Sequence, residues 1–89
     1  MGANAARHAM EIVENVRYVV AIELMTAAQA IDLRPEGPAR LGPRTKEAYK
    51  EIRKLVSFMD HDRQTTHDID ALVALIRSGD LLEAVDPIV

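Results

Sequence analysis

Three histidines are the first residues of this 89-residue sequence that could do chemistry, because histidine titrates near neutral pH and binds metal ions. His8 lies far along the chain from His61 and His67, which flank an acidic stretch. The acidic residues of this stretch are Asp60, Asp62 and Asp68. They lack the regular alternation of oxygen ligands and the final glutamate of a calcium-binding EF-hand loop. The pattern therefore predicts solvated loop and capping residues, and no metal ligand is assigned.

Nucleophiles and phosphate-binding loops are the next possibility. Ser57 and Ser78 stand in ordinary loop and helix-end contexts, without the glycine-rich turn that exposes a nucleophilic serine. The two Gly-Pro pairs do not have the spacing of a phosphate-cradling loop. Arg63 could bind a ligand, but bonding to the carbonyl groups at a helix end is the favoured role. No catalytic or cofactor-binding residue is assigned.

The amino-acid composition indicates the class of fold that positions these side chains. A chain of 89 residues fits one small domain, and its 48% hydrophobic content includes only 3% aromatic residues. A core of Ala, Val, Leu, Ile and Met is typical of helix-on-helix packing and argues against a β-sandwich. An all-α fold is expected.

Charge and targeting signals exclude several partners. The net charge is −3, and the eleven Lys and Arg residues are spread along the chain, so no nucleic-acid partner is expected. The chain has no cysteine, which fits a reducing compartment. The first residues do not form a signal peptide, and no run of 18 apolar residues suggests a membrane span. A cytoplasmic location without membrane contact is expected.

Proline and glycine divide the sequence into helices. Residues from about 3 to 32 contain neither, which predicts one long helix, and the loop 33–43 contains three prolines and two glycines. Further helices are expected at about 44–56, capped by Gly42 or Thr45, and at about 67–78, capped by Thr65 or Thr66 after the loop 57–66. A short helical turn at about 80–85 follows Gly79. The expected apolar faces are Tyr49, Ile52, Leu55 or Val56 and Met59 in one helix, and Ile69, Leu72, Val73 and Ile76 in the next.

The long helix carries more apolar surface than the rest of the chain can cover. Thirty helical residues extend about 45 Å, whereas a compact domain of this length is only about 30 Å across. Beyond Tyr18 the polar arc thins, so the second half is apolar nearly all round. An apolar stripe at steps of three and four residues is the predicted interface: Val13, Val16, Val20, Leu24, Ala27 and Ile31. We expect this helix to self-associate or to belong to a larger helical bundle.

Four segments, taken in order, resemble the C-terminal region of bacterial histidine ammonia-lyases, a branch of the aromatic amino-acid ammonia-lyase family. The central one is ENVRYVVAIELMTAAQAIDLR, residues 14–34, which is similar to the family's long helix. The flanking segments are MGANAARHA (1–9), LGPRTKEAYKEIRKLVSFMDHDR (41–63) and DIDALVALIRSGDLLEAV (68–85). Two places depart from the family: Ser57 replaces a usual proline, and residues 64–67 replace a Pro-Leu-His-Pro-like run. These departures leave the substrate of the parent enzyme open.

The resemblance implies a role in assembly. Family members are tetramers whose long helices form a central bundle, and they convert an amino acid such as histidine to an unsaturated acid such as urocanate plus ammonia. Their electrophilic methylidene-imidazolone group forms from an Ala-Ser-Gly tripeptide, which these 89 residues do not contain. The resemblance therefore implies a C-terminal fragment that is not catalytic alone and that partners either itself or an upstream catalytic portion. The alternative is a free-standing helical module for oligomerisation or partner binding, without lyase activity.

Overall fold

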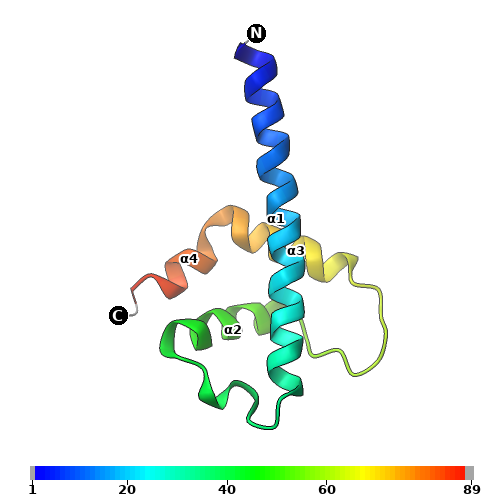
Figure 1. Ribbon diagram of the computed structural model, residues 1–89, viewed down its shortest axis with the longest axis vertical. Coiled ribbons are helices and arrows are strands. Elements are labelled where there is room, and N and C mark those ends of the chain that lie inside the picture. The colour runs from blue at the N-terminus through cyan, green and yellow to red at the C-terminus, as the bar shows by residue number, and fades with distance from the viewer. Residues whose placement is uncertain (1, 88–89) are drawn as a thin grey trace.

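One long helix is the axis around which the other elements are arranged. In the computed structural model, which describes residues 2–87, helix α1 (Gly2–Leu33) spans most of the molecule. Helices α2 (Pro43–Leu55), α3 (Thr66–Ser78) and α4 (Asp80–Val85) gather around the C-terminal half of α1 (Figure 1). The described residues form helices and turns, with no strand among them. The predicted all-α class, with one long helix, two shorter ones and a short C-terminal one, is confirmed.

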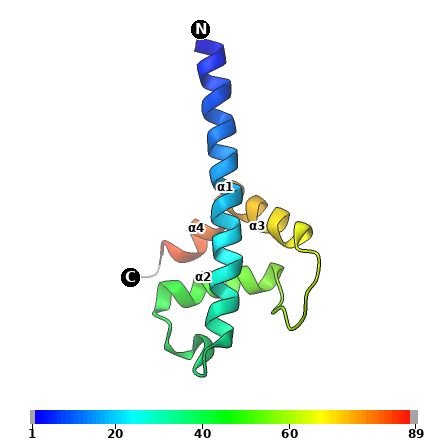
Figure 2. The same ribbon diagram turned by 45° about the vertical axis from the view of Figure 1, so that its right-hand side comes forward.

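The N-terminal half of α1 projects beyond the rest of the chain. Both views show it extending free of α2, α3 and α4 (Figures 1 and 2). The longest dimension of the molecule is 53 Å, and its radius of gyration is 15.1 Å. A compact chain of this length would have a radius of gyration of about 12 Å. The structure thus has the overhang expected from the length of α1. Across residues 2–87, no helix combines the length and the apolar character needed to cross a membrane.

Local backbone chemistry explains where α1 ends and α2 begins. Arg34 precedes Pro35, and the residue before a proline is disfavoured in the helical conformation. The chain then reverses through Gly37, whose φ of 54° suits glycine, and through a short 3-10 helix, η1 (Gly37–Arg40). Helix α2 starts after Gly42 with Pro43 as its first residue, a position where the missing N–H of proline costs nothing.

Gly79 separates the last two helices. Its φ of 83° is left-handed, which ends α3 and redirects the chain into α4. At the other end of α3, Thr65 holds the capping position, although its side chain makes no capping hydrogen bond. Asp80 and Glu83 lie in the first turn of α4, where negative charge is favourable to the helix dipole.

A small core joins the C-terminal half of α1 to the other helices. Its fully buried members are Ala21, Ala28, Ile52, Val56, Leu72 and Val73. Helix α1 packs chiefly against α3, and its two buried residues are both alanine. Ala28 lies beside Tyr49 and Ile52 of α2. The second helix buries Ile52, followed by Val56 just past its end, while Leu55 is 44% exposed. Of the two alternatives in the predicted face, Val56 is therefore the core residue.

Candidate assembly interface

The residues first considered for chemistry do not form a cluster. His8 is exposed on the overhanging part of α1, and His67 is exposed at the start of α3. His61 pairs only with its neighbour Asp60, Nδ1 to Oδ1 at 2.9 Å, and its side chain is 83% exposed. Within residues 2–87, no three His, Cys, Asp or Glu side chains come together in a way that could hold a metal ion.

Arg63 has the structural role that the sequence favoured. Its guanidinium group donates hydrogen bonds to the carbonyl oxygens of Ser57 (2.7 Å) and Phe58 (3.2 Å), just beyond the end of α2. The same group pairs with the Asp68 carboxylate in the first turn of α3, with Nη2 to Oδ2 at 3.1 Å. Arg63 thus ties the loop between α2 and α3 to the start of α3, and its donors are directed at protein groups.

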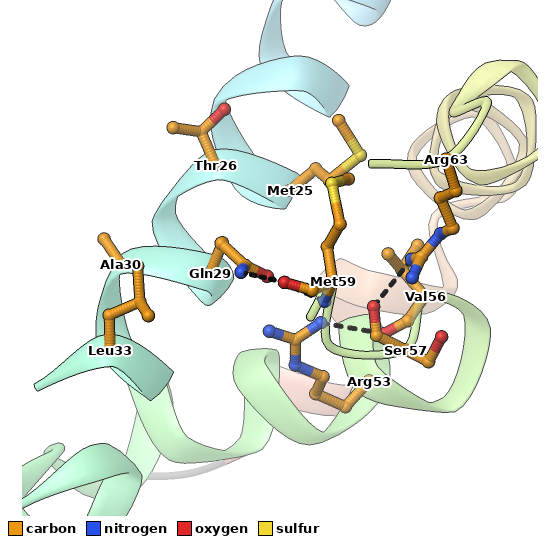
Figure 3. A pocket seen from close by; sticks show the side chains of 10 residues that line it. All are labelled: Met25, Thr26, Gln29, Ala30, Leu33, Arg53, Val56, Ser57, Met59 and Arg63. Carbon is orange, nitrogen blue, oxygen red and sulfur yellow. Dashed lines mark hydrogen bonds between the residues drawn. The ribbon is translucent and has the colours of Figure 1, made fainter. Parts of the chain in front are cut away.

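Gln29 fixes the same loop to α1, a contact that sequence reasoning missed. Its side-chain Nε2 donates to the carbonyl oxygen of Met59 at 2.7 Å, and the Met59 backbone N–H donates to Gln29 Oε1 at 3.0 Å (Figure 3). The amide of Gln29 therefore mimics a paired backbone strand and satisfies both polar groups of one loop residue. No local signal marks this pair, because the partners are thirty residues apart in sequence.

A shallow apolar groove lies beside this contact, between α1 and the loop that follows α2. It has a volume of about 270 Å³. Its lining is Met25, Thr26, Gln29, Ala30, Leu33, Arg53, Val56, Ser57, Met59 and Arg63 (Figure 3). The guanidinium groups of Arg53 and Arg63 at its edge already bond to backbone carbonyls and carboxylates. The groove is therefore suited to apolar side chains more than to a charged ligand.

Asp32 anchors the end of α1 to α2. Its carboxylate accepts a bond from Arg53 Nη2 at 2.5 Å and another from the Tyr49 hydroxyl. The Asp32 and Arg53 side chains are only 16% and 15% exposed, so the pair is largely shielded from water. The hydrogen bond to the Asp32 carboxylate raises the pKa of Tyr49, and burial adds to the effect. This cluster fixes α2 against the C-terminal end of α1.

The polar side of α1 is used to hold α3. Glu14 pairs with Arg77 near the end of α3 and with Arg17 on its own helix at 2.9 Å. The hydrogen bonds from Arg17 and then Arg77 lower the pKa of the Glu14 carboxyl. Tyr18 donates to Asp70 of α3 at 3.3 Å. In the first half of α1, polar side chains at Glu14 and Tyr18 thus face α3. Apolar side chains such as Val13 and Val16 are exposed to solvent.

The predicted interface residues fall into two groups. Val13 and Val16 are 48% and 53% exposed, and Ala27 is also exposed. Val20, Leu24 and Ile31 are half-buried, and Leu24 packs against the core. The stripe therefore runs along the border between the chain's own core and open solvent.

Further large apolar side chains of α1 are exposed outside this stripe. They are Met10 (73%), Ile12 (50%), Val19 (55%) and Ile22 (45%). Exposed apolar side chains in this number on one helix are typical of an interaction site. Near the lower end of this surface, Val20 and Leu24 open into an apolar cleft of about 430 Å³ against α2 and the α3–α4 corner, where Leu82 is 69% exposed.

These features define an all-helical segment. Its polar side chains bond within the chain, and its long helix has an exposed apolar face. The chain belongs to the aromatic amino acid lyase family, which it matches over residues 1–54. It is 46% identical over 88 residues to a histidine ammonia-lyase of Symbiobacterium thermophilum and 48% identical over 88 residues to one of Clostridium tetani. A histidine ammonia-lyase 1 of Fusobacterium nucleatum is 45% identical over 86 residues.

These alignments include nearly all of this chain but a small part of each relative. They cover 99% of the chain for the Symbiobacterium protein and 97% for the other two. The chain spans only 16–17% of the length of these relatives. No solved structure matches the chain.

Proposed function

We propose that this chain is the helical assembly segment of a histidine ammonia-lyase-like enzyme, which releases ammonia from L-histidine to give urocanate in the cytoplasm. The observation that supports this proposal is the open apolar face of α1, in a segment that aligns along nearly its full length with histidine ammonia-lyases. In this role α1 supplies packing surface for neighbouring helices of the enzyme, and α2 to α4 support its lower half.

The proposal assigns no reacting group to these residues. The electrophilic group expected for the family forms from Ala-Ser-Gly, and this sequence contains no such tripeptide. Its own residues therefore cannot form that group, and no catalytic step is assigned to them. Arg63, Arg53 and Asp32 have structural partners, which fits a supporting role.

A chimeric enzyme tests the proposal. The segment of the Clostridium tetani relative that aligns with this chain, at 48% identity, is replaced by the present sequence. We expect the chimera to assemble as the parent does and to form urocanate from histidine, because the segment provides packing surface of the same kind. The parent enzyme lacking the segment is the control and should neither assemble nor react.

Two results would contradict the proposal. One is a soluble chimera that fails to assemble and makes no urocanate, although its helix content matches that of the parent. The other is urocanate formation by the isolated 89-residue chain above a buffer control, which would place the chemistry within this segment.

A further inference from the structure

The segment that follows α2 takes its shape from side chains. Within residues 2–87, no hydrogen bond between two backbone groups involves residues 57–64, and these residues belong to no helix. An ordered segment must then satisfy its polar backbone groups in another way. Four successive carbonyl groups, those of residues 56–59, each accept a hydrogen bond from a side chain. We call residues 56–59 the strap.

Two arginines hold the first three residues of the strap. Arg53 of α2 donates to the carbonyl oxygen of residue 56 at 3.0 Å. Arg63 donates to the carbonyl oxygens of residues 57 and 58 at 2.7 Å and 3.2 Å. Each guanidinium group is itself fixed by a carboxylate on a different helix. Asp32 of α1 lies 2.5 Å from Arg53, and Asp68 of α3 lies 3.1 Å from Arg63.

Gln29 of α1 holds the last residue of the strap. Its side-chain amide makes hydrogen bonds to both backbone groups of Met59, at 2.7 Å and 3.0 Å. The Met59 N–H therefore bonds to a side chain thirty residues away in sequence. Figure 3 shows Gln29, Arg53 and Arg63 directed at the strap from different sides.

One peptide unit couples these donors. A peptide unit is planar, so the carbonyl group of one residue and the N–H of the next move together. The Phe58 carbonyl, which accepts from Arg63, and the Met59 N–H, which donates to Gln29, belong to the same unit. Arg63 and Gln29 therefore hold one rigid plane at two of its edges. Contacts that share a group in this way are not additive, because the loss of one weakens the other.

The strap can leave α1 without unfolding the helices. Ser57 and Phe58 are exposed, so the strap buries little apolar surface beyond Val56 and Met59. Val56 is 2% exposed, and its N–H bonds to Ile52 within the last turn of α2 at 2.9 Å. Segments with few buried contacts open at a lower free energy than the core does. Movement is thus expected at residues 57–59, while Val56 stays with α2.

We propose that the strap is a latch on the groove between α1 and the loop after α2. Gln29, Arg53 and Arg63 hold it as one unit, and its release opens the groove, because Met59 is part of the groove lining. The four helices stay in place when the strap is released. This inference goes beyond the assembly role proposed above and does not rest on it.

Amide hydrogen exchange of the 89-residue chain, followed by NMR, tests this proposal. Gln29→Ala removes both bonds to Met59 and should accelerate exchange of the Met59 amide at least about tenfold. Arg63→Gln should do the same, although Arg63 bonds to residues 57 and 58 and not to Met59. The Val56 amide should change less than about twofold in both variants. Lys54→Gln is the matched control, because Lys54 is an exposed cation of α2 that pairs with its own helix, and it should leave both amides unchanged.

Three results would overturn the proposal. One is unchanged exchange of Met59 in Arg63→Gln, since each donor would then hold its own residue alone. Another is acceleration at Val56 or Ile69, the amides that mark α2 and α3, equal to that at Met59. The third concerns the double variant of Gln29 and Arg63. A single unit predicts less than about threefold further acceleration over either single variant, whereas independent contacts would multiply their effects. The chimera experiment above fails or succeeds independently of these rates.

Discussion

Two charge substitutions on α1 should have different effects, although both lie in the predicted interface. Val16 is 53% exposed, whereas Leu24 is half-buried and packs against the core. We expect Val16→Asp to separate the copies while the chain's own core survives. Leu24→Asp should unfold the chain, because it places a charge without a partner against the core.

The effect of Val16→Asp on self-association can be estimated from the exposed fraction of the Val16 side chain. Complete burial of a valine side chain contributes about 1.5–3 kcal/mol, so covering the exposed half of Val16 contributes roughly 0.8–1.6 kcal/mol in each copy. A symmetric pair loses this contribution twice, which raises the dissociation constant about 15- to 200-fold. Desolvation of the two new carboxylates increases the loss. The free energy of unfolding of the separated chain should change by only about 0.5 kcal/mol, as for other exposed positions.

Light scattering and thermal unfolding measured together separate these outcomes. The unmodified chain should have twice its monomer mass of 9.9 kDa, and its unfolding midpoint should rise with protein concentration. Val16→Asp should have the monomer mass and keep a cooperative transition whose midpoint does not depend on concentration. Asn15→Asp is the matched control, because it introduces the same side chain at an exposed position outside the predicted interface. An unchanged dimer in Val16→Asp, or a loss of structure equal to that of Leu24→Asp, would refute the reasoning.

Three further substitutions test the contacts that hold the helices together. Asp32→Asn should lower the pKa of Tyr49 toward its ordinary value, as measured by tyrosinate absorbance, and should decrease the free energy of unfolding by about 1–3 kcal/mol. The pKa of Tyr49 is higher in the folded chain than in the unfolded chain, so neutral Tyr49 contributes to stability. This contribution is complete below about pH 10 and is lost as the pH rises through the pKa of Tyr49 in the folded chain. The Asp32→Asn variant should not show this loss of stability at high pH. Because the folded pKa of Glu14 is lowered, its contribution is present above about pH 4.3 and is lost as the pH falls through the folded value. Arg77→Gln should reduce this acid dependence of the urea midpoint. Gly79→Ala should decrease the free energy of unfolding by about 1 kcal/mol or more, because its φ of 83° is strained for alanine while nothing lies within 4 Å of the added Cβ.

The order of the helices can be predicted from the sequence because the signals that end them are local. Pro35 and Gly37 terminate α1, and Gly79, in its left-handed conformation, separates α3 from α4. The apolar positions of α3 also follow from their spacing, and Leu72 and Val73 are fully buried as expected. These features depend on a few neighbouring residues, so a single sequence is sufficient to place them.

The side of α1 that faces its own chain could not be predicted in the same way. The spacing rule selected the stripe with the largest apolar residues, but the most buried positions of α1 are Ala21 and Ala28. Small residues carry little weight in an apolar pattern, yet they are the positions of α1 that the other helices cover most completely. The Gln29–Met59 contact is also absent from any local pattern, because the loop conformation that creates it depends on Arg63 and α3.

This difference explains why the second half of α1 is apolar nearly all round. One side, at Ala21 and Ala28, belongs to the chain's own core, and another, which includes Val16 and Ala27 of the predicted interface, is exposed and is the side that we expect a neighbour to cover. Within residues 2–87 the core has only six buried hydrophobic side chains, two of them alanine, which is a small core for a chain of this length. Such a core can hold α2, α3 and α4 on the lower half of α1, but it leaves the overhang uncovered. We therefore expect the separated chain to keep its fold, and we expect the surface covered on assembly to add to its stability.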